Sequence, residues 1–329
     1  PGVILPANGY LVVFASNKDR AELGAPLHTN FALSGDGEYL GLLDPDGNVV
    51  SHFFPTYPRQ QPDVSYGLGL AGGPEVFGYF ETPTPGAPNG PAYPGISGKV
   101  RFSTPGGTFF KSLSVGLELP DDATENAVIR YTLDGSVPHE FWSLYAQPLV
   151  IKTTMQVRAK VFDPGLAMGP TVSETYIALS RDVADFTSNL PLVALDNFGG
   201  GWMPQTSYQP AAMAIFEPAN GRSSLTNAPD LETRAGIKIR GASTAGRAKA
   251  SLAVEAWNEV DEDKNISPFG MPRESDWVLW GPYEFDLALM RNPLIYELSN
   301  QVGRYAVRTR FVEVFINTGG GALSSSDYW

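Results

Sequence analysis

The sequence has no cysteine and only three histidines, His28, His52 and His139, which are scattered along the chain. These absences exclude disulfides, thiolate metal sites and a cysteine nucleophile, and they argue against a histidine-rich zinc site. A lack of cysteine does not fix the compartment. No apolar run approaches the roughly 18 residues that a membrane helix needs, so we expect no transmembrane segment in this chain.

Positive charge is also scarce. The chain has 23 Lys and Arg against 35 Asp and Glu, a formal net charge of -12. Such a field repels phosphate backbones, so nucleic-acid binding would need a strong local basic patch. Residues 234–259 alone gather enough cations, namely Arg234, Lys238, Arg240, Arg247 and Lys249. We expect no nucleic-acid partner.

Proline and glycine, by contrast, are plentiful, with 28 Pro and 35 Gly among 329 residues, and 43% of the residues are hydrophobic. This balance supplies a core and many turns, and it favours short strands over long helices. The length fits two or three domains. Turn-rich stretches at 82–98 and 180–191 predict three units, 1–90, 91–181 and 182–329.

The first unit predicts strands joined by tight turns, one of them at Pro45-Asp46-Gly47. The glycine-rich SGDGEYLG lacks phosphate-loop spacing and precedes a strand, so we interpret it as a hairpin. Residues 3–89, with LHTNFALSGDGEYLGLLDPDGNVVSHF and ETPTPGAPN, resemble the lamin-tail domain. The resemblance implies an immunoglobulin-like β-sandwich whose first strands are missing, which leaves an open edge.

The second unit predicts a half-buried strand, in which Val157, Ala159 and Val161 alternate with Arg158 and Lys160. With YTLDGS and VRAKVF, residues 99–178 resemble the C-terminal β-sandwich of chitobiase and β-hexosaminidase enzymes. The resemblance implies a spacer or weak carbohydrate contact, and not hydrolysis.

Two groups in this unit allow a more specific interpretation. Asp134 and Glu140 could imitate a glycosidase pair, but we expect them to cap and solvate a loop. Phe141, Trp142 or Tyr145 could stack on sugar rings, but we expect them to pack in the core.

The third unit begins with predicted strands at 190–198 and 213–218. GIKIRG then places Ile237 and Ile239 inward and Lys238 outward, and a returning strand follows the ASTAG turn. Arg240, Arg247 and Lys249 therefore crowd one end of a hairpin. They either hold phosphate oxygens or form a solvated hairpin end that balances the acids of this unit.

Farther on, Asn292 is a predicted N-cap, Pro293 suits the first helical position, and Gly303 ends the helix. A strand at 308–317 follows, so the unit is α+β. NEVDEDKN at 258–265 partly imitates a calcium loop but lacks its central glycine and final glutamate, which favours a charged surface turn.

Over residues 191–317, the ordered motifs GIKIRG, RAKASLAVEAWNE, RNPLIYELSNQVG and RTRFVEVFIN resemble the N-terminal part of the CotH kinase family, an atypical secretory protein kinase. The resemblance implies ATP and a divalent metal as cofactors of the complete domain. It implies phosphate contacts from Arg240 and Lys249, and Glu297 as the acid that orients the lysine. The family has two adjacent basic residues where this chain has Arg247-Ala248-Lys249, so only Lys249 matches.

The resemblance also places the metal-holding acids after the 308–317 strand, and the sequence given stops at Trp329. We therefore expect no catalytic residue and no metal site in this chain, inactivity in isolation, and some exposed apolar surface.

The predicted fold is mainly β, with two immunoglobulin-like β-sandwiches followed by an α+β partial kinase-like lobe. The leading hypothesis is an extracellular or cell-surface bacterial protein in which the sandwiches present a CotH-type kinase domain to a protein substrate or a cell-surface partner. The alternatives are an adhesion or scaffold protein with a kinase-like binding surface, or a carbohydrate-contacting module.

Overall fold

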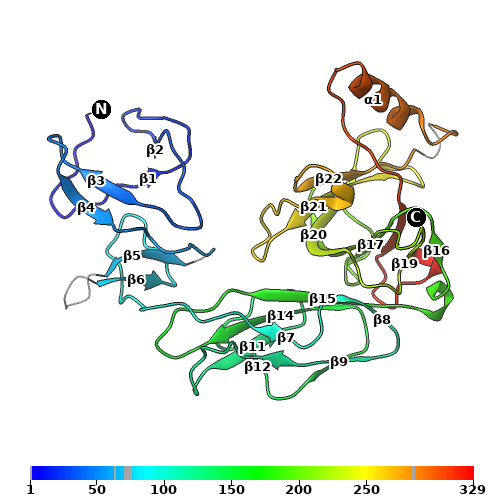
Figure 1. The fold of residues 1–329 in the computed structure, drawn as a ribbon, viewed down its shortest axis with the longest axis horizontal. Helices are drawn as coiled ribbons and strands as arrows, with labels where there is room; N and C mark the ends of the chain where they lie inside the picture. The colour runs from blue at the N-terminus through cyan, green and yellow to red at the C-terminus, as the bar shows by residue number, and fades with distance from the viewer. Residues whose placement is uncertain (1, 63, 70–75, 283–285) are drawn as a thin grey trace. The chain divides into compact units, whose positions relative to one another are not determined.

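The computed structural model describes residues 2–62, 64–69, 76–282 and 286–329. The described chain is predominantly β and contains one α-helix, near the C-terminus, which confirms the predicted fold class (Figure 1). Two compact units result: Pro1–Lys99, Leu119–Val128 and Lys160–Pro170 form the first, and Val100–Glu118, Ile129–Ala159 and Thr171–Trp329 form the second. Residues 63, 70–75 and 283–285, which fall within the ranges 3–89 and 191–317 compared with families above, lie outside the described residues.

The N-terminal strands lie in the first unit and form three two-stranded pairs, β1 with β2 in parallel, and β3 with β4 and β5 with β6 antiparallel. Their bounds are Val13–Phe14 (β1), Leu27–His28 (β2), Leu40–Leu43 (β3), Val49–Phe53 (β4), Ser65–Gly69 (β5) and Val76–Phe80 (β6). The predicted turn closes β3 and β4, because Asp44 Oδ1 accepts hydrogen bonds from the backbone N–H of Asp46 at 3.0 Å and of Asn48 at 2.8 Å. The lamin-tail resemblance remains a prediction.

The next group of strands forms a five-stranded sheet in the order β12-β11-β14-β15-β8 and two smaller pairs, β10-β7 and β13-β9. The bounds are Arg101–Phe102 (β7), Gly107–Phe109 (β8), Leu113–Val115 (β9), Leu117–Glu118 (β10), Val128–Thr132 (β11), Ser143–Leu144 (β12), Leu149–Ile151 (β13), Met155–Phe162 (β14) and Val172–Ala178 (β15). Tyr176 of β15 is buried and donates its hydroxyl hydrogen to Thr104 O at 2.7 Å.

One expectation for β14 is wrong. Val157, Ala159 and Val161 are buried as predicted, but Arg158, expected on a solvated face, is buried as well. The alternation predicted the strand and its buried face correctly, but it did not predict the burial of Arg158. A turn from the last part of the chain covers the polar face of this strand at Arg158.

The last part of the chain forms a six-stranded sheet in the order β22-β21-β20-β18-β17-β23, antiparallel except between β17 and β23. The strands are Thr187–Ser188 (β16), Leu192–Asp196 (β17), Gln209–Phe216 (β18), Ser223–Ser224 (β19), Leu231–Arg240 (β20), Ser251–Trp257 (β21), Asp276–Leu279 (β22) and Glu313–Asn317 (β23), with 3₁₀ helices at Arg181–Val183, Pro268–Gly270 and Ser325–Asp327. The predicted order of strands, helix and strand is confirmed. β23 begins later than position 308, because its neighbour β17 begins only at Leu192 and the ladder cannot extend past it.

This sheet is covered on both faces. One face carries a large apolar cluster that includes Ile237, Ile239, Leu252 and Val254. The opposite face packs against residues from the end of β15 and the segment after it, in a cluster of Ile177, Leu179, Val183, Leu192, Ala194, Ala214, Phe216, Leu225, Phe315 and Leu323. The sandwich strands and the six-stranded sheet therefore share a core within the second unit.

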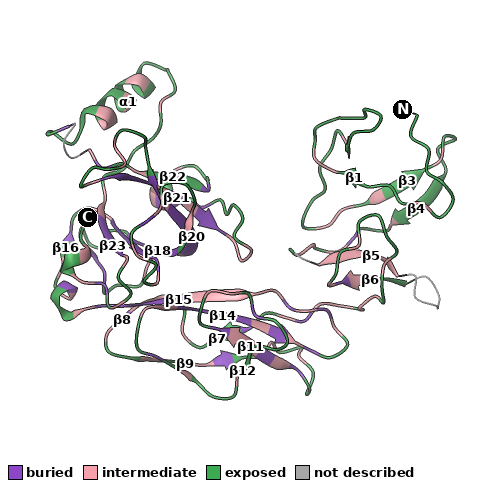
Figure 2. Ribbon diagram, turned by 180° about the vertical axis from the view of Figure 1, so that it is seen from behind, coloured by how far each residue is buried: buried purple, intermediate pink, exposed green. Residues whose placement is uncertain are grey.

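The helix α1 spans Arg291–Gln301 and begins one residue before the predicted N-cap Asn292. The buried Asp286 explains the shift, since its Oδ2 accepts a hydrogen bond from Arg291 N at 2.5 Å and satisfies the first turn. Gly303, with φ of 79°, follows the helix end as predicted. No residue of α1 is buried (Figure 2). Within the described residues, no helix has the length and apolar character needed to cross a bilayer.

Candidate functional site

The hairpin of β20 and β21 places the predicted phosphate contacts. Arg240 is the last residue of β20 and pairs with Ser251, the first residue of β21. Ile237 and Ile239 are buried, and Arg240 is exposed, as the alternation predicted. Strand alternation therefore carries Arg240 to solvent at the hairpin end.

Lys249 lies in the turn between these strands and is half-buried. Its stem packs on the backbone of Gly281, where an added Cβ would lie 2.9 Å from Lys249 Cγ. Among the described residues, neither Lys249 nor Arg240 has a side-chain ion pair or hydrogen bond. Both cations flank one turn and are available to an anion.

Glu297 lies elsewhere. It is exposed on α1, where its Oε1 accepts a hydrogen bond from Gln301 Nε2 at 3.0 Å, and it lines a cavity of about 200 Å³ together with Arg308 and Arg310. In the part of the chain that the structure describes, no ion pair joins Glu297 to Lys249. The structure thus brings two of the three predicted residues to one hairpin end, and the proposed lysine–glutamate pair is not formed.

The acidic turn after β21 has a different role from a metal loop. Asn258 Oδ1 accepts hydrogen bonds from Val260 N at 2.8 Å and Glu262 N at 3.1 Å, which closes the turn. Its carboxylates Glu259 and Asp261 face arginines. Across residues 2–62, 64–69, 76–282 and 286–329, no group of three His, Cys, Asp or Glu side chains could hold a metal ion.

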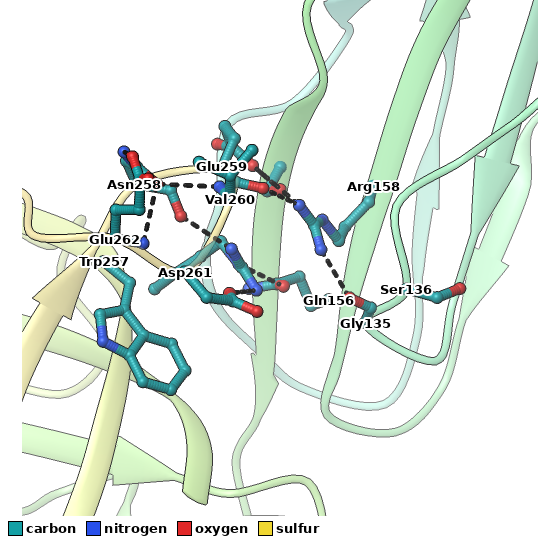
Figure 3. Close-up of polar contacts among 12 residues, drawn as sticks. Gly135, Ser136, Gln156, Arg158, Trp257, Asn258, Glu259, Val260, Asp261 and Glu262 are labelled. Atoms are coloured by element: carbon teal, nitrogen blue, oxygen red, sulfur yellow. Dashed lines mark hydrogen bonds and ion pairs between the residues drawn. The ribbon is translucent and has the colours of Figure 1, made fainter. Parts of the chain in front are cut away.

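Arg158 reaches from β14 to this turn (Figure 3). Its side chain is only 1% exposed, and its Nη2 donates to Glu259 O and lies 3.6 Å from Glu259 Oε2. Its Nη1 donates to Gly135 O at 2.6 Å. Burial, and then the nearby Arg234, lower the pKa of Arg158 to about 10, so the guanidinium remains charged at neutral pH.

Arg234 reaches in the opposite direction, from β20 to β14. Its Nε donates to Gln156 Oε1 at 3.0 Å, its Nη1 donates to Asn258 O at 2.7 Å, and its Nη2 lies 2.5 Å from Asp261 Oδ1. The two arginines therefore bind the same turn from two different sheets. We call Arg158, Arg234 and residues 258–261 the arginine clamp.

Two carboxylates pack near the clamp. Glu174 Oε2 accepts a hydrogen bond from Gly106 N at 2.5 Å, and burial raises the pKa of Glu174. Burial also raises the pKa of Glu232 to about 7, assisted by the neighbouring Glu174 and Glu259 and opposed by Thr175 and Lys264. Glu232 is thus partly protonated near neutral pH.

The aromatic loop before β12 contradicts our expectation. Phe141 is 82% exposed and Trp142 37% exposed, so neither belongs to the core. Both instead contact His139, with ring centroids 5.9 Å from Phe141 and 5.0 Å from Trp142. The loop at residues 133–142 contains no strand, so its aromatic side chains do not pack against a sheet.

Tyr145, by contrast, is half-buried and packs edge-on against Tyr131, with centroids 6.5 Å apart. Asp134 caps its loop as expected, because its Oδ1 accepts hydrogen bonds from Ser136 N at 3.0 Å and Ser136 Oγ at 2.6 Å. These bonds lower the pKa of Asp134.

Comparison with known families agrees with two of these regions. Residues 237–329 match the family model "CotH kinase protein". Residues 104–173 match the model "Chitobiase/beta-hexosaminidase C-terminal domain". The first match spans the β20–β21 hairpin from Ile237 onward, the turn of the arginine clamp and α1, and the second includes Arg158. No curated protein and no solved structure matches the chain significantly.

The free energy of unfolding of the second unit should fall as the pH rises from 4.5 to about 7. Burial raises the pKa of Glu232 from 4.5 to about 7, so its contribution is complete below pH 4.5 and is lost as the pH rises from there to about 7. Asp196, whose pKa burial raises to about 6, acts in the same direction. About 1 kcal/mol is expected from Glu232, because water partly screens this half-buried group.

Urea unfolding of Glu232→Gln, followed by tryptophan fluorescence, checks this expectation. Gln keeps an oxygen that accepts from Thr175 and removes the titration, so the pH dependence should flatten, whereas the exposed Glu22→Gln should retain it. An unchanged slope in Glu232→Gln contradicts the assignment. Asp182, whose pKa Ser325 holds near 2, loses its contribution only at lower pH and does not interfere.

Proposed function

We propose that the chain belongs to a secreted or cell-surface bacterial protein whose atypical protein kinase domain includes residues 182–329. The match of residues 237–329 to the CotH kinase model, over a hairpin whose basic end is open to solvent, supports this proposal. The complete domain uses ATP and a divalent metal, and a protein is its phosphate acceptor or cell-surface partner. Residues 3–89, as a lamin-tail-like module, and the chitobiase-like region serve as accessory modules.

The residues present fit only part of such a site. Arg240 and Lys249 flank one turn without described side-chain partners, which suits the oxygens of a triphosphate. No described set of carboxylates fits a divalent metal. We therefore expect this chain to contact nucleotide phosphates but not to transfer phosphate.

The experiment is calorimetric titration of the chain with ADP, together with an assay for transfer from radiolabelled ATP. Arg240→Ala combined with Lys249→Ala should weaken ADP binding at least tenfold, because both phosphate contacts are removed. The exposed Lys152→Ala is the control and should bind normally. Equal binding by all three proteins contradicts the phosphate role, and no ADP binding at all favours an adhesion or scaffold role instead. Phosphate transfer that survives Lys249→Ala contradicts the expected inactivity.

A second function, weak carbohydrate contact, is favoured by the exposure of Phe141 and Trp142. Exposed aromatic faces can stack on sugar rings. Binding of chito-oligosaccharides that is lost in Trp142→Ala and kept in Phe186→Leu supports it, since Phe186 packs on Phe315 away from this loop. A glycan array without Trp142-dependent binding removes this function.

A further inference from the structure

The segment between α1 and β23 ends in a stretch, residues 307–312, that leads into β23. Among the described residues, the backbone of residues 307–312 forms no hydrogen bond, although the next residue, Glu313, donates its N–H to Pro191 O at 2.9 Å. Val307 and Phe311 are each 51% exposed. An extended segment with unpaired donors and acceptors can pair with an added extended chain.

Residues of this segment line two cavities. The cavity of about 200 Å³ is lined by Arg308 and Arg310, and the cavity of about 360 Å³ is lined by Leu190, Phe269 and Phe311, with Arg310 contributing to both. A cationic depression therefore adjoins an apolar one.

The charge of the segment contrasts with that of the chain. Residues 298–312 contain three arginines and no Asp or Glu, in a chain of net charge -12. In the described part of the chain, the side chains of Arg304, Arg308 and Arg310 have no ion pair or hydrogen bond. Of the two acids at the cavities, Glu297 is tied to Gln301, and Glu217 lies on the apolar side. The exposed cations therefore favour an acidic ligand.

We propose that residues 304–312, with these two cavities, bind an extended acidic peptide segment that carries one apolar anchor residue. The peptide backbone pairs with residues 307–312, its carboxylates lie against Arg308 and Arg310, and its apolar side chain enters the cavity at Phe311. Unpaired arginines select carboxylates by charge, and the apolar cavity selects the anchor. The binding needs no nucleotide, so its outcome is separate from that of the kinase proposal.

Fluorescence anisotropy of the full 329-residue chain tests the proposal. The probe is a labelled peptide of glutamates around a central phenylalanine, and lysines replace the glutamates in the comparison peptide. The acidic peptide should bind with a Kd that rises with salt, and the lysine peptide should not bind. Arg308→Gln combined with Arg310→Gln should raise the Kd at least tenfold, and Phe311→Ser should also raise it.

The matched control is Lys18→Gln with Arg20→Gln, which removes the same charge from exposed positions in the other unit and should leave the Kd unchanged. Since the substituted side chains are exposed, circular dichroism should show folded variants. The proposal is overturned if both peptides bind equally well, or if the Kd is unchanged in the arginine variant. It is also overturned if the control variant loses as much affinity as the arginine variant. Equally tight binding of an oligonucleotide overturns it in favour of a general polyanion surface. The proposal is also overturned, in favour of a second copy of this chain, if light scattering finds a dimer that dissociates in Phe311→Ser.

Discussion

The second unit depends on how two buried guanidinium groups are neutralised. A buried charge is strongly unfavourable unless it is paired and its hydrogen-bonding groups are satisfied. Arg158 and Arg234 are paired by binding the same turn, through backbone carbonyls and through the carboxylates of Glu259 and Asp261. Among the described residues, Arg158 Nε is buried without a hydrogen-bond partner, so the pairing of this group is incomplete. Because β14 carries one arginine and β20 the other, neutralising the charges also joins two sheets. The β20–β21 hairpin, with its basic end, is therefore held on the sandwich strands.

The arginines of this chain divide by environment, and the division has functional consequences. Those of the clamp are buried and paired with carboxylates, so they contribute to folding and not to recognition. Arg308 and Arg310 are exposed and lack described partners, so their charge is available to a ligand. Arg240 is exposed and Lys249 is half-buried, and they flank the turn between two largely buried strands. The buried cations of this acidic chain thus form internal ion pairs, whereas its exposed cations are available to bind an anion.

Local patterns predicted much of this fold from sequence. The alternation of apolar and polar residues predicted β20 and β21, the turn residues predicted the β3–β4 hairpin, and Gly303 predicted the end of the helix. The errors arose where distant residues decide. Arg158 looked solvent-facing because residues 258–261, which cover it, lie about a hundred positions away in the sequence. The helix begins before the expected N-cap because Asp286, five residues upstream of Arg291, accepts the hydrogen bond of the first turn. The acidic turn itself looked like a charged surface loop, because no local signal shows that its carboxylates face arginines. The pair of Lys249 and Glu297 stays a prediction: the structure forms no ion pair between them in its described part, and Glu297 lines a cavity together with Arg308.

The most direct test of the clamp is urea unfolding of Arg234→Met compared with Arg222→Met. Arg234 crosses between the sheets, whereas Arg222 is exposed and its side chain bonds, within the described residues, to Thr187 alone. If the clamp joins sandwich and sheet, Arg234→Met should lower the free energy of unfolding by about 3 kcal/mol or more and should split the unfolding of the second unit into two transitions, while Arg222→Met changes it by less than about 1 kcal/mol. A loss no larger than that of Arg222→Met, with a single transition retained, would contradict the central role of these buried charges.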